Sequence, residues 1–269
     1  VALELMPGNK IRKYDTWHAM GQGATTGSLV VTLEALKEMH LTPEDIQLIQ
    51  NDTKTCPDTG MAGASRSLYM DGNATIIAAN KLLAAMRKED GTLRTYDEMK
   101  AEGIETKYLG RYETNTTPGL CRLDPNTGIG DPTPAFTYCL NLAEVEVDTK
   151  TGKTTVLKFT CVDFVGRIGN IDAVNGQAYS GIMHGIGFAL KEDYADVKKH
   201  ANMFGAGTSY IKDVPDDIDL IHIDGAISDG PFGSSGASEA FQASGHCAVL
   251  NGIYNACGVR IHEIPALPE

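Results

Sequence analysis

Four glycine-rich segments, each followed directly by a helical pattern, constrain this chain more than any other feature. They lie around Gly21, Gly60, Gly166 and Gly233. Glycine leaves room for a bulky group to approach the backbone, and the first turn of a helix offers unpaired N–H groups and partial positive charge. Because glycines also make ordinary tight turns, one such junction alone means little. Four together favour helix N-termini that converge on a large polyanionic cofactor with a diphosphate.

The last of these segments, residues 229–239, ends in a carboxylate. Small residues precede Glu239, and Ser238 is a good N-cap for a helix predicted from Glu239 to about Cys257, with Gly258 closing it. An acidic residue in a first helical turn is ordinary stabilisation by the helix dipole. The same position also suits a catalytic group that faces a bound cofactor, so position alone leaves both interpretations open.

Charge and cysteine spacing exclude several classes of function. The chain of 269 residues has a formal net charge of −12. Sequence-independent binding of nucleic acid needs clustered Lys and Arg, so this charge argues against such binding. Its apolar runs are too short to span a bilayer, so we expect a soluble cytoplasmic protein with no membrane partner. The six cysteines show no pair at the two-residue spacing of iron–sulphur or structural zinc sites. We therefore expect buried cysteines and no metal ligand among the side chains.

Glycine makes up about 11% of the chain, 29 of 269 residues, against an average of about 7%. The periodicities around these glycines predict an α+β fold with mixed sheets and packed helices, in two α/β subdomains. The first covers residues 1–135, including a long connecting loop at 114–135 that carries four prolines and three glycines. The second covers residues 136–269 and carries Glu239.

The expected elements of the first subdomain are strands at 3–6, 10–16, 46–51 and 106–112, and helices after Gly27, after Arg66 to about Lys88, and from Thr95 to Gly103. Those of the second are a strand pair at 136–147 and 153–165, strands at 218–224 and 259–264, and helices through Leu190 and over 239–257. The parity of apolar residues changes near Ala143, which predicts a bulge or burial of both faces there. Four glycines in the helix through Leu190 predict that another backbone or a ligand comes very close.

Arg66 stands at the start of its helix, where a cation opposes the helix dipole. It either points to solvent as a surface charge or meets a bound anion. The position of Arg66 in the sequence does not distinguish between these two interpretations.

Four segments carry a resemblance that spans nearly the whole chain: 20–24, 63–66, the helix with Gln177 and Gly185-Ile186-Gly187, and 232–245. Together they resemble the molybdenum-binding half of the molybdenum hydroxylases. This is the xanthine oxidase family, and the likeness is closer to its bacterial aldehyde oxidoreductase branch. Only the C-terminal, second molybdopterin-binding domain is represented, and the fold it implies is the α+β fold predicted above.

The resemblance implies that Glu239 is a general base beside molybdenum. The residues that it places around the pterin and its nucleotide are Met20, Gly21, Gln22, Gly23, Ala24, Gly63, Ala64, Ser65, Arg66, Gln177, Ser235, Gly236, Ala237 and Ser238. The implied cofactor is molybdopterin cytosine dinucleotide with molybdenum, and the implied chemistry oxidises a small aldehyde to a carboxylic acid with water as the oxygen source. Iron–sulphur clusters would remove the electrons, on upstream domains or subunits that act as partners. The isolated chain is expected to hold no cofactor and to be inactive, and a homodimer is left open.

The chain departs from the family pattern at two points. Many relatives have Gly-Val-Gly-Glu where Gly236-Ala237-Ser238-Glu239 stands here, which suits the aldehyde branch, and many have glutamine in place of His184. A core or loop-bonded role is expected for His184. Two other functions stay open from the sequence: a non-catalytic subunit that holds the cofactor for a partner chain, and a lone nucleotide-binding module.

Overall fold

The computed structural model describes residues 1–114, 122–227 and 229–268. They divide into two compact units, each with its own sheet and helices. The first unit comprises Val1–Phe136, Gly166–Asn170 and Ala226–Gly236, and the second comprises Thr137–Val165, Ile171–Gly225 and Ala237–Glu269. The predicted α+β class is confirmed. Part of the predicted connecting loop, residues 115–121, lies outside the described residues.

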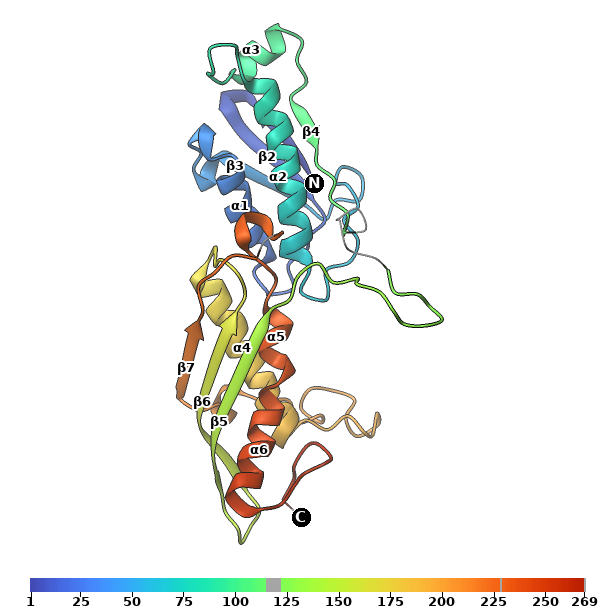
Figure 1. Cartoon of the computed structure of the whole chain (residues 1–269), viewed down its shortest axis with the longest axis vertical. Coiled ribbons are helices and arrows are strands. Elements are labelled where there is room, and N and C mark those ends of the chain that lie inside the picture. Colours follow the sequence, from blue (N-terminus) through green and yellow to red (C-terminus); the bar gives the residue numbers. More distant parts are fainter. Residues whose placement is uncertain (115–121, 228, 269) are drawn as a thin grey trace. The chain divides into compact units, whose positions relative to one another are not determined.

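The sheet of the first unit has the order β3-β2-β1-β4 (Figure 1). Strands β1 (Ala2–Met6) and β2 (Lys10–Asp15) form the predicted hairpin, turning at Pro7–Asn9. β3 (Ile46–Gln50) pairs parallel with β2, and β4 (Lys107–Leu109) pairs antiparallel with β1. β4 is shorter than the strand predicted at 106–112.

Three helices complete this unit: α1 (Ala24–Ala35), α2 (Ser67–Met86) and α3 (Tyr96–Ala101). α2 packs on β1, β4 and α1 and contributes Ala78 and Leu82 to a core that includes Leu3 and Ile11. Thr95 caps α3 as expected, since its side chain accepts a hydrogen bond from the Glu98 amide. Two of the glycine segments therefore open onto α1 and α2, as the sequence predicted.

The sheet of the second unit has the order β5-β6-β7. β5 (Tyr138–Val147) and β6 (Thr154–Phe164) are antiparallel, and their register shifts between Glu144 and Val145, which confirms the irregularity predicted near Ala143. β7 (Asp217–His222) pairs parallel with β6. It ends two residues earlier than the strand predicted at 218–224.

Helices α4 (Ile171–Leu190), α5 (Ser238–Ala243) and α6 (Gly245–Cys257) pack with this sheet (Figure 1). The glycines of α4 allow a close crossing. A Cβ added to Gly181 would lie 2.5 Å from Phe241 Cβ, and one on Gly185 would lie 2.9 Å from the Cα of Gly245. The predicted close approach of another backbone is confirmed at these two positions, whereas Gly176 faces open space.

The C-terminal part of the chain differs from the prediction in three ways. The single helix expected from Glu239 to Cys257 is broken at Ser244, whose φ of −121° and ψ of 0° are not helical. Ser238 is not the N-cap, because the helix already includes it and Ala237 takes the cap position without a side-chain hydrogen bond. The strand expected at 259–264 is wrong, since these described residues form no ladder with a neighbour. Gly258 closes α6 in the left-handed conformation, as predicted.

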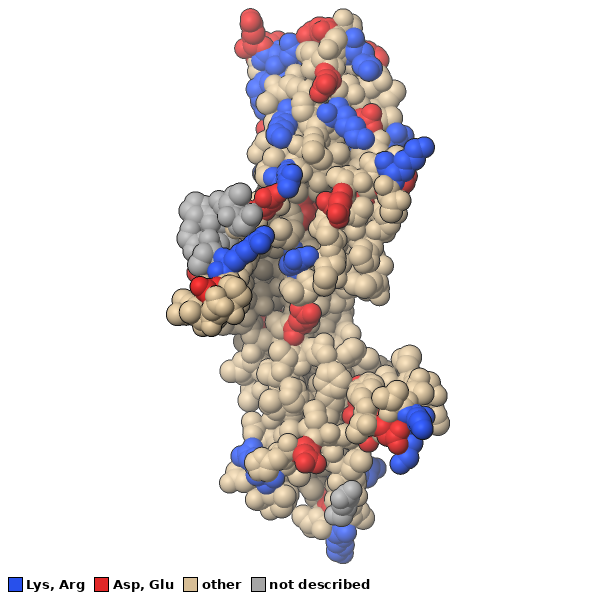
Figure 2. All heavy atoms as spheres, turned by 90° about the vertical axis from the view of Figure 1, so that its right-hand side faces the viewer, with Lys and Arg blue, Asp and Glu red and all other residues tan. Residues whose placement is uncertain are grey.

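Charged side chains of both signs are scattered among other residues on the surface drawn in Figure 2. On the face drawn in Figure 2, Lys and Arg side chains are interspersed with Asp and Glu. Within the described residues, no helix is long and apolar enough to cross a membrane.

Candidate functional site

The first glycine loop ends at the N-terminus of α1. Gly21 and Gly23 adopt φ values of 109° and 83°, which residues with a Cβ rarely adopt, and Gly23 occupies the N-cap position. Gln22 braces this loop, because its Nε2 donates to the His18 carbonyl at 3.0 Å and its Oε1 accepts from the Met20 amide. Gly23 has no side chain to cap α1, so the first amides of the helix remain available to an anion.

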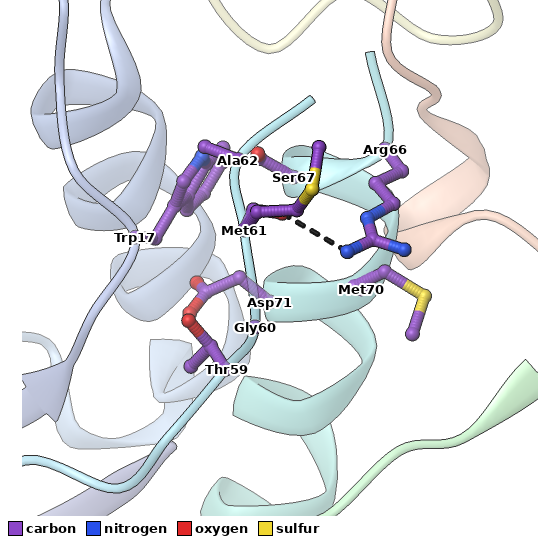
Figure 3. A pocket seen from close by; sticks show the side chains of 9 residues that line it. All are labelled: Trp17, Thr59, Gly60, Met61, Ala62, Arg66, Ser67, Met70 and Asp71. Atoms are coloured by element: carbon purple, nitrogen blue, oxygen red, sulfur yellow. Dashed lines mark hydrogen bonds between the residues drawn. The ribbon is translucent and has the colours of Figure 1, made fainter. Parts of the chain in front are cut away.

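The second glycine loop is held in an unusual backbone conformation before α2. Ala64 and Ser65 both lie in the left-handed region, with φ values of 53° and 47°. Such conformations cost free energy for residues with a side chain and are common where a backbone binds a ligand. Arg66 is exposed, and its Nη2 donates a hydrogen bond to the Met61 carbonyl at 3.1 Å (Figure 3). This bond orients the guanidinium along the loop.

The structure brings the second loop and the Glu239 loop together at Gly236. A Cβ added there would lie only 1.4 Å from the Ser65 carbonyl oxygen, so no other residue fits without moving the backbone. Ser65 and Gly236 are 171 positions apart in the sequence but meet within the first unit. Two segments predicted to hold the cofactor are therefore in direct contact.

A pocket of about 170 Å³ adjoins this loop. Figure 3 shows the side chains around it, which come from the end of β2, the second loop and the first turns of α2. Its lining is formed by Trp17, Thr59, Gly60, Met61, Ala62, Arg66, Ser67, Met70 and Asp71. Among the described residues, Trp17 Nε1 and Asp71 Oδ1 are buried without a hydrogen-bond partner. Because such groups are costly when unsatisfied, the pocket suits a ligand with both donors and acceptors.

Buried charges support the pocket from behind. Lys13 Nζ donates to Asp71 Oδ2 at 2.7 Å and lies 3.6 Å from Asp15 Oδ2, and all three side chains are buried. Burial raises the pKa of Asp71, and the neighbouring Lys13 ammonium partly offsets this. Asp15 also accepts hydrogen bonds from Ser28 and Gln50. The network fixes the end of β2 against α1 and α2.

Ser235 belongs to the first unit, and the second unit carries Gln177 on α4 and Ala237, Ser238 and Glu239 at the start of α5. Gly181 contacts Phe241 and Gly185 contacts Gly245, so α4 and α5–α6 run in the same direction. Gln177 lies one helical turn before Gly181 on α4, and Ala237 lies four residues before Phe241, so we expect these two residues to lie near the same end of the packed helices. Glu239 is exposed there, and Gln177 is half-buried.

His184 is exposed on α4, with its ring against that of Phe188 at 6.3 Å between centroids, so of the two roles expected for it, core or loop-bonded, the core position is wrong. Trp17, Thr59 and Asp71 line the pocket although the sequence patterns did not predict them there. A signal was present, since Lys13 and Asp71 are opposite charges at inward positions of a strand and a helix. No group of three or more His, Cys, Asp or Glu within the described residues is arranged to hold a metal ion.

The two-unit α+β fold and its glycine loops are those of a cofactor-binding domain, and comparison with known proteins identifies its family. Residues 1–215 match the molybdopterin cofactor-binding domain family. The chain belongs to this family, and its resemblance to the molybdenum hydroxylases is confirmed.

Individual relatives support this family assignment. The aldehyde oxidoreductase of Megalodesulfovibrio gigas is 41% identical over 266 residues, which are 99% of this chain and 29% of that protein. The crystal structure of the aldehyde oxidoreductase from Desulfovibrio desulfuricans superposes with a TM-score of 0.95 at 44% identity, again covering 99% of this chain and 29% of that one. A probable hypoxanthine oxidase of Escherichia coli is 28% identical over 94% of this chain. The chain thus spans less than a third of the length of these aldehyde oxidoreductases.

Proposed function

We propose that this chain is the C-terminal cofactor-binding part of a molybdenum-dependent aldehyde oxidoreductase that converts aldehydes to carboxylic acids with water as the oxygen source. The observation that carries the proposal is the 41% identity to the Megalodesulfovibrio gigas aldehyde oxidoreductase over 99% of the chain. The proposed cofactor is molybdopterin cytosine dinucleotide. Upstream domains with iron–sulphur clusters would receive the electrons, and the cytoplasm is the proposed location.

The residues of the first unit fit such a group. The contact of Gly236 with Ser65 brings two of the predicted loops together, and the left-handed backbone at Ala64 and Ser65 is of a kind common where a main chain binds a ligand. The first amides of α1 and the Arg66 guanidinium supply donors for a diphosphate. The buried Trp17 Nε1 and Asp71 Oδ1 supply a donor and a carboxyl group for the rest of the ligand. When bound, the cofactor supplies the redox centre that accepts two electrons from the substrate.

The proposed role of Glu239 is that of general base. An exposed carboxylate in the first turn of α5 can reach a ligand or a water molecule. It would take the proton from the water that provides the oxygen atom, and the Gln177 amide, on the helix α4 that packs against α5, would help to orient the reactants.

Glu239→Gln in the complete enzyme tests this proposal. It should keep the fold and the molybdenum content but slow the oxidation of a simple aldehyde by about 10²–10⁴-fold, the range for loss of a general base. Asp172→Asn is a matched control, because Asp172 is also an exposed acid in the first turn of a helix, α4. Near-normal turnover of Glu239→Gln with full metal content would remove Glu239 from the mechanism. An enzyme without molybdenum or aldehyde oxidation would refute the proposed function itself.

A further inference from the structure

The outward face of the β5-β6-β7 sheet carries apolar side chains where an antiparallel sheet open to water carries polar ones. On β5 the outward residues are Tyr138, Leu140 and Leu142, which are 65%, 55% and 57% exposed. Leu140 pairs with Val162 of β6, and Val162 pairs with Ile221 of β7, which is 50% exposed. Directly paired residues lie on the same face of a sheet, so these side chains form one continuous patch.

We define this apolar patch as Tyr138, Leu140, Leu142, Val162, Phe164 and Ile221. It has a clear limit along the strands. Level with Leu142 the same face carries Thr160 on β6 and Asp219 on β7, and one pair further along it carries Glu144, Lys158 and Asp217. Lys158 Nζ lies 2.8 Å from Asp219 and 3.3 Å from Asp217. The face therefore changes from apolar to ionic within a single sheet, so its apolar part has the character of an interface and its ionic part that of a water-exposed surface.

The helices of this unit leave the patch uncovered because they pack on the opposite face. The alternate residues of β5 point toward them: the Asn141 amide donates to Ser244 Oγ at 2.9 Å, and Gly252 of α6 packs against Val145. Phe159 and Cys161 of β6 are completely buried. The inward face is thus filled by this chain's own helices, whereas the outward face is not.

We propose that the apolar patch is the docking surface for another domain of the same enzyme, one of those for which this chain has no counterpart. The inference rests on the proposed function. The length of the relatives supports it, since 99% of this chain aligns with only 29% of the Megalodesulfovibrio gigas enzyme. Charge disfavours a second copy as the occupant, because three carboxylates and one ammonium border the patch and the chain has a net charge of −12. An apolar surface on another domain of the same enzyme is opposed neither by a second set of bordering carboxylates nor by a second net charge of −12.

Hydroxyl-radical footprinting with mass spectrometry tests the inference without any substitution. Side-chain oxidation of Tyr138, Leu140 and Leu142 would be compared between the isolated 269-residue chain, held at a concentration where it is monomeric, and the complete enzyme. We expect these residues to be reactive in the isolated chain and strongly protected in the complete enzyme. Thr155, an exposed residue near the ionic end of β6, should react equally in both. Equal reactivity of Leu140 and Leu142 in the two samples overturns the inference.

A substitution supplies a second readout. Leu142→Lys leaves the isolated chain folded, because Leu142 is exposed, and its melting temperature should change by less than about 4 °C. In the complete enzyme the same change buries an unpaired ammonium, so binding of the chain to the separately produced remainder should weaken by about tenfold or more. Thr155→Lys should leave that binding unchanged. A patch that becomes protected only as the isolated chain is concentrated indicates a second copy and overturns the inference.

The two proposals fail in different ways. An enzyme that contains molybdenum and oxidises aldehydes while its patch stays reactive disproves the docking surface alone. A complete protein that protects the patch but lacks molybdenum and activity disproves the proposed function alone.

Discussion

Lys13 carries its charge on the inward side of β2, with no part of its side chain exposed. Its Nζ contacts Asp71 Oδ2 at 2.7 Å and Thr75 Oγ1 at 2.9 Å. A buried ion pair adds little net stability over apolar residues, but removal of one partner leaves a buried charge. The pair is therefore a constraint on how β2 and α2 pack behind the pocket.

Replacement of Lys13 by Met should lower the free energy of unfolding by about 3–5 kcal/mol, because Asp71 and Asp15 then lack their cation. Burial raises the pKa of Asp71 above that of the unfolded chain. A raised carboxyl pKa gives stability that is complete below the unfolded value, near 3.8, and is lost as pH rises through the folded value. The loss in Lys13→Met should therefore be smaller at acidic pH than at neutral pH. Urea denaturation of both proteins across this range measures it, and a loss that grows on acidification would contradict the assignment.

Gly236 is the residue at which two distant segments of the proposed cofactor site meet. Gly236→Ala should force Ser65 away, since its Cβ would lie 1.4 Å from the Ser65 carbonyl oxygen. In the complete enzyme we expect a marked loss of bound molybdenum, measured by elemental analysis. Gly27→Ala is the control, because its Cβ meets only Trp17 Cη2, at 3.6 Å, and alanine suits the helix. Full metal content in Gly236→Ala would show that this close approach does not shape the site.

At the scale of single elements, the sequence predicted what local patterns determine. Helix N-termini after glycine loops, the Thr95 cap and the β5–β6 irregularity all follow from residues close together in the chain. The break at Ser244 was missed because the apolar pattern continues across it, whereas the packing of Gly245 on Gly185 depends on a partner helix 60 residues away. The buried position of Lys13 was missed for the same reason: its partner lies 58 residues further along the chain.

The helix crossing at Gly185 yields a prediction at this scale. Gly185→Ala should destabilise the chain by about 1–3 kcal/mol, because its Cβ would lie 2.9 Å from the Gly245 Cα and two helix backbones cannot separate cheaply. Gly176→Ala on the same helix meets nothing within 4 Å and should be neutral or stabilising by up to about 1 kcal/mol. Thermal unfolding of both variants measures these changes in stability, and equal stabilities would show that the α4 crossing at Gly185 is loosely packed.

At the scale of the whole molecule, the family and the α+β class could be recognised from sequence because the glycine motifs occur in order along the chain. The pairing of segments that lie far apart in the sequence could not. Ser65 meets Gly236, and Asp163 Oδ2 lies 2.7 Å from His222 Nδ1, only through the fold. The residues that form the pocket wall, Trp17, Thr59 and Asp71, become neighbours in the same way.

The final prediction concerns the isolated chain. Each unit has its own sheet and packed helices, so the 269-residue protein should fold and unfold cooperatively. If the proposed site also needs donors from another domain, the isolated chain lacks them, and affinity falls by far more than half because the ordering costs remain. We therefore expect it to purify without molybdenum and to show no aldehyde oxidation, whereas the complete enzyme shows both. Elemental analysis and a dye-coupled aldehyde assay measure this, and stoichiometric molybdenum with turnover in the isolated chain would show that the site is complete within these residues.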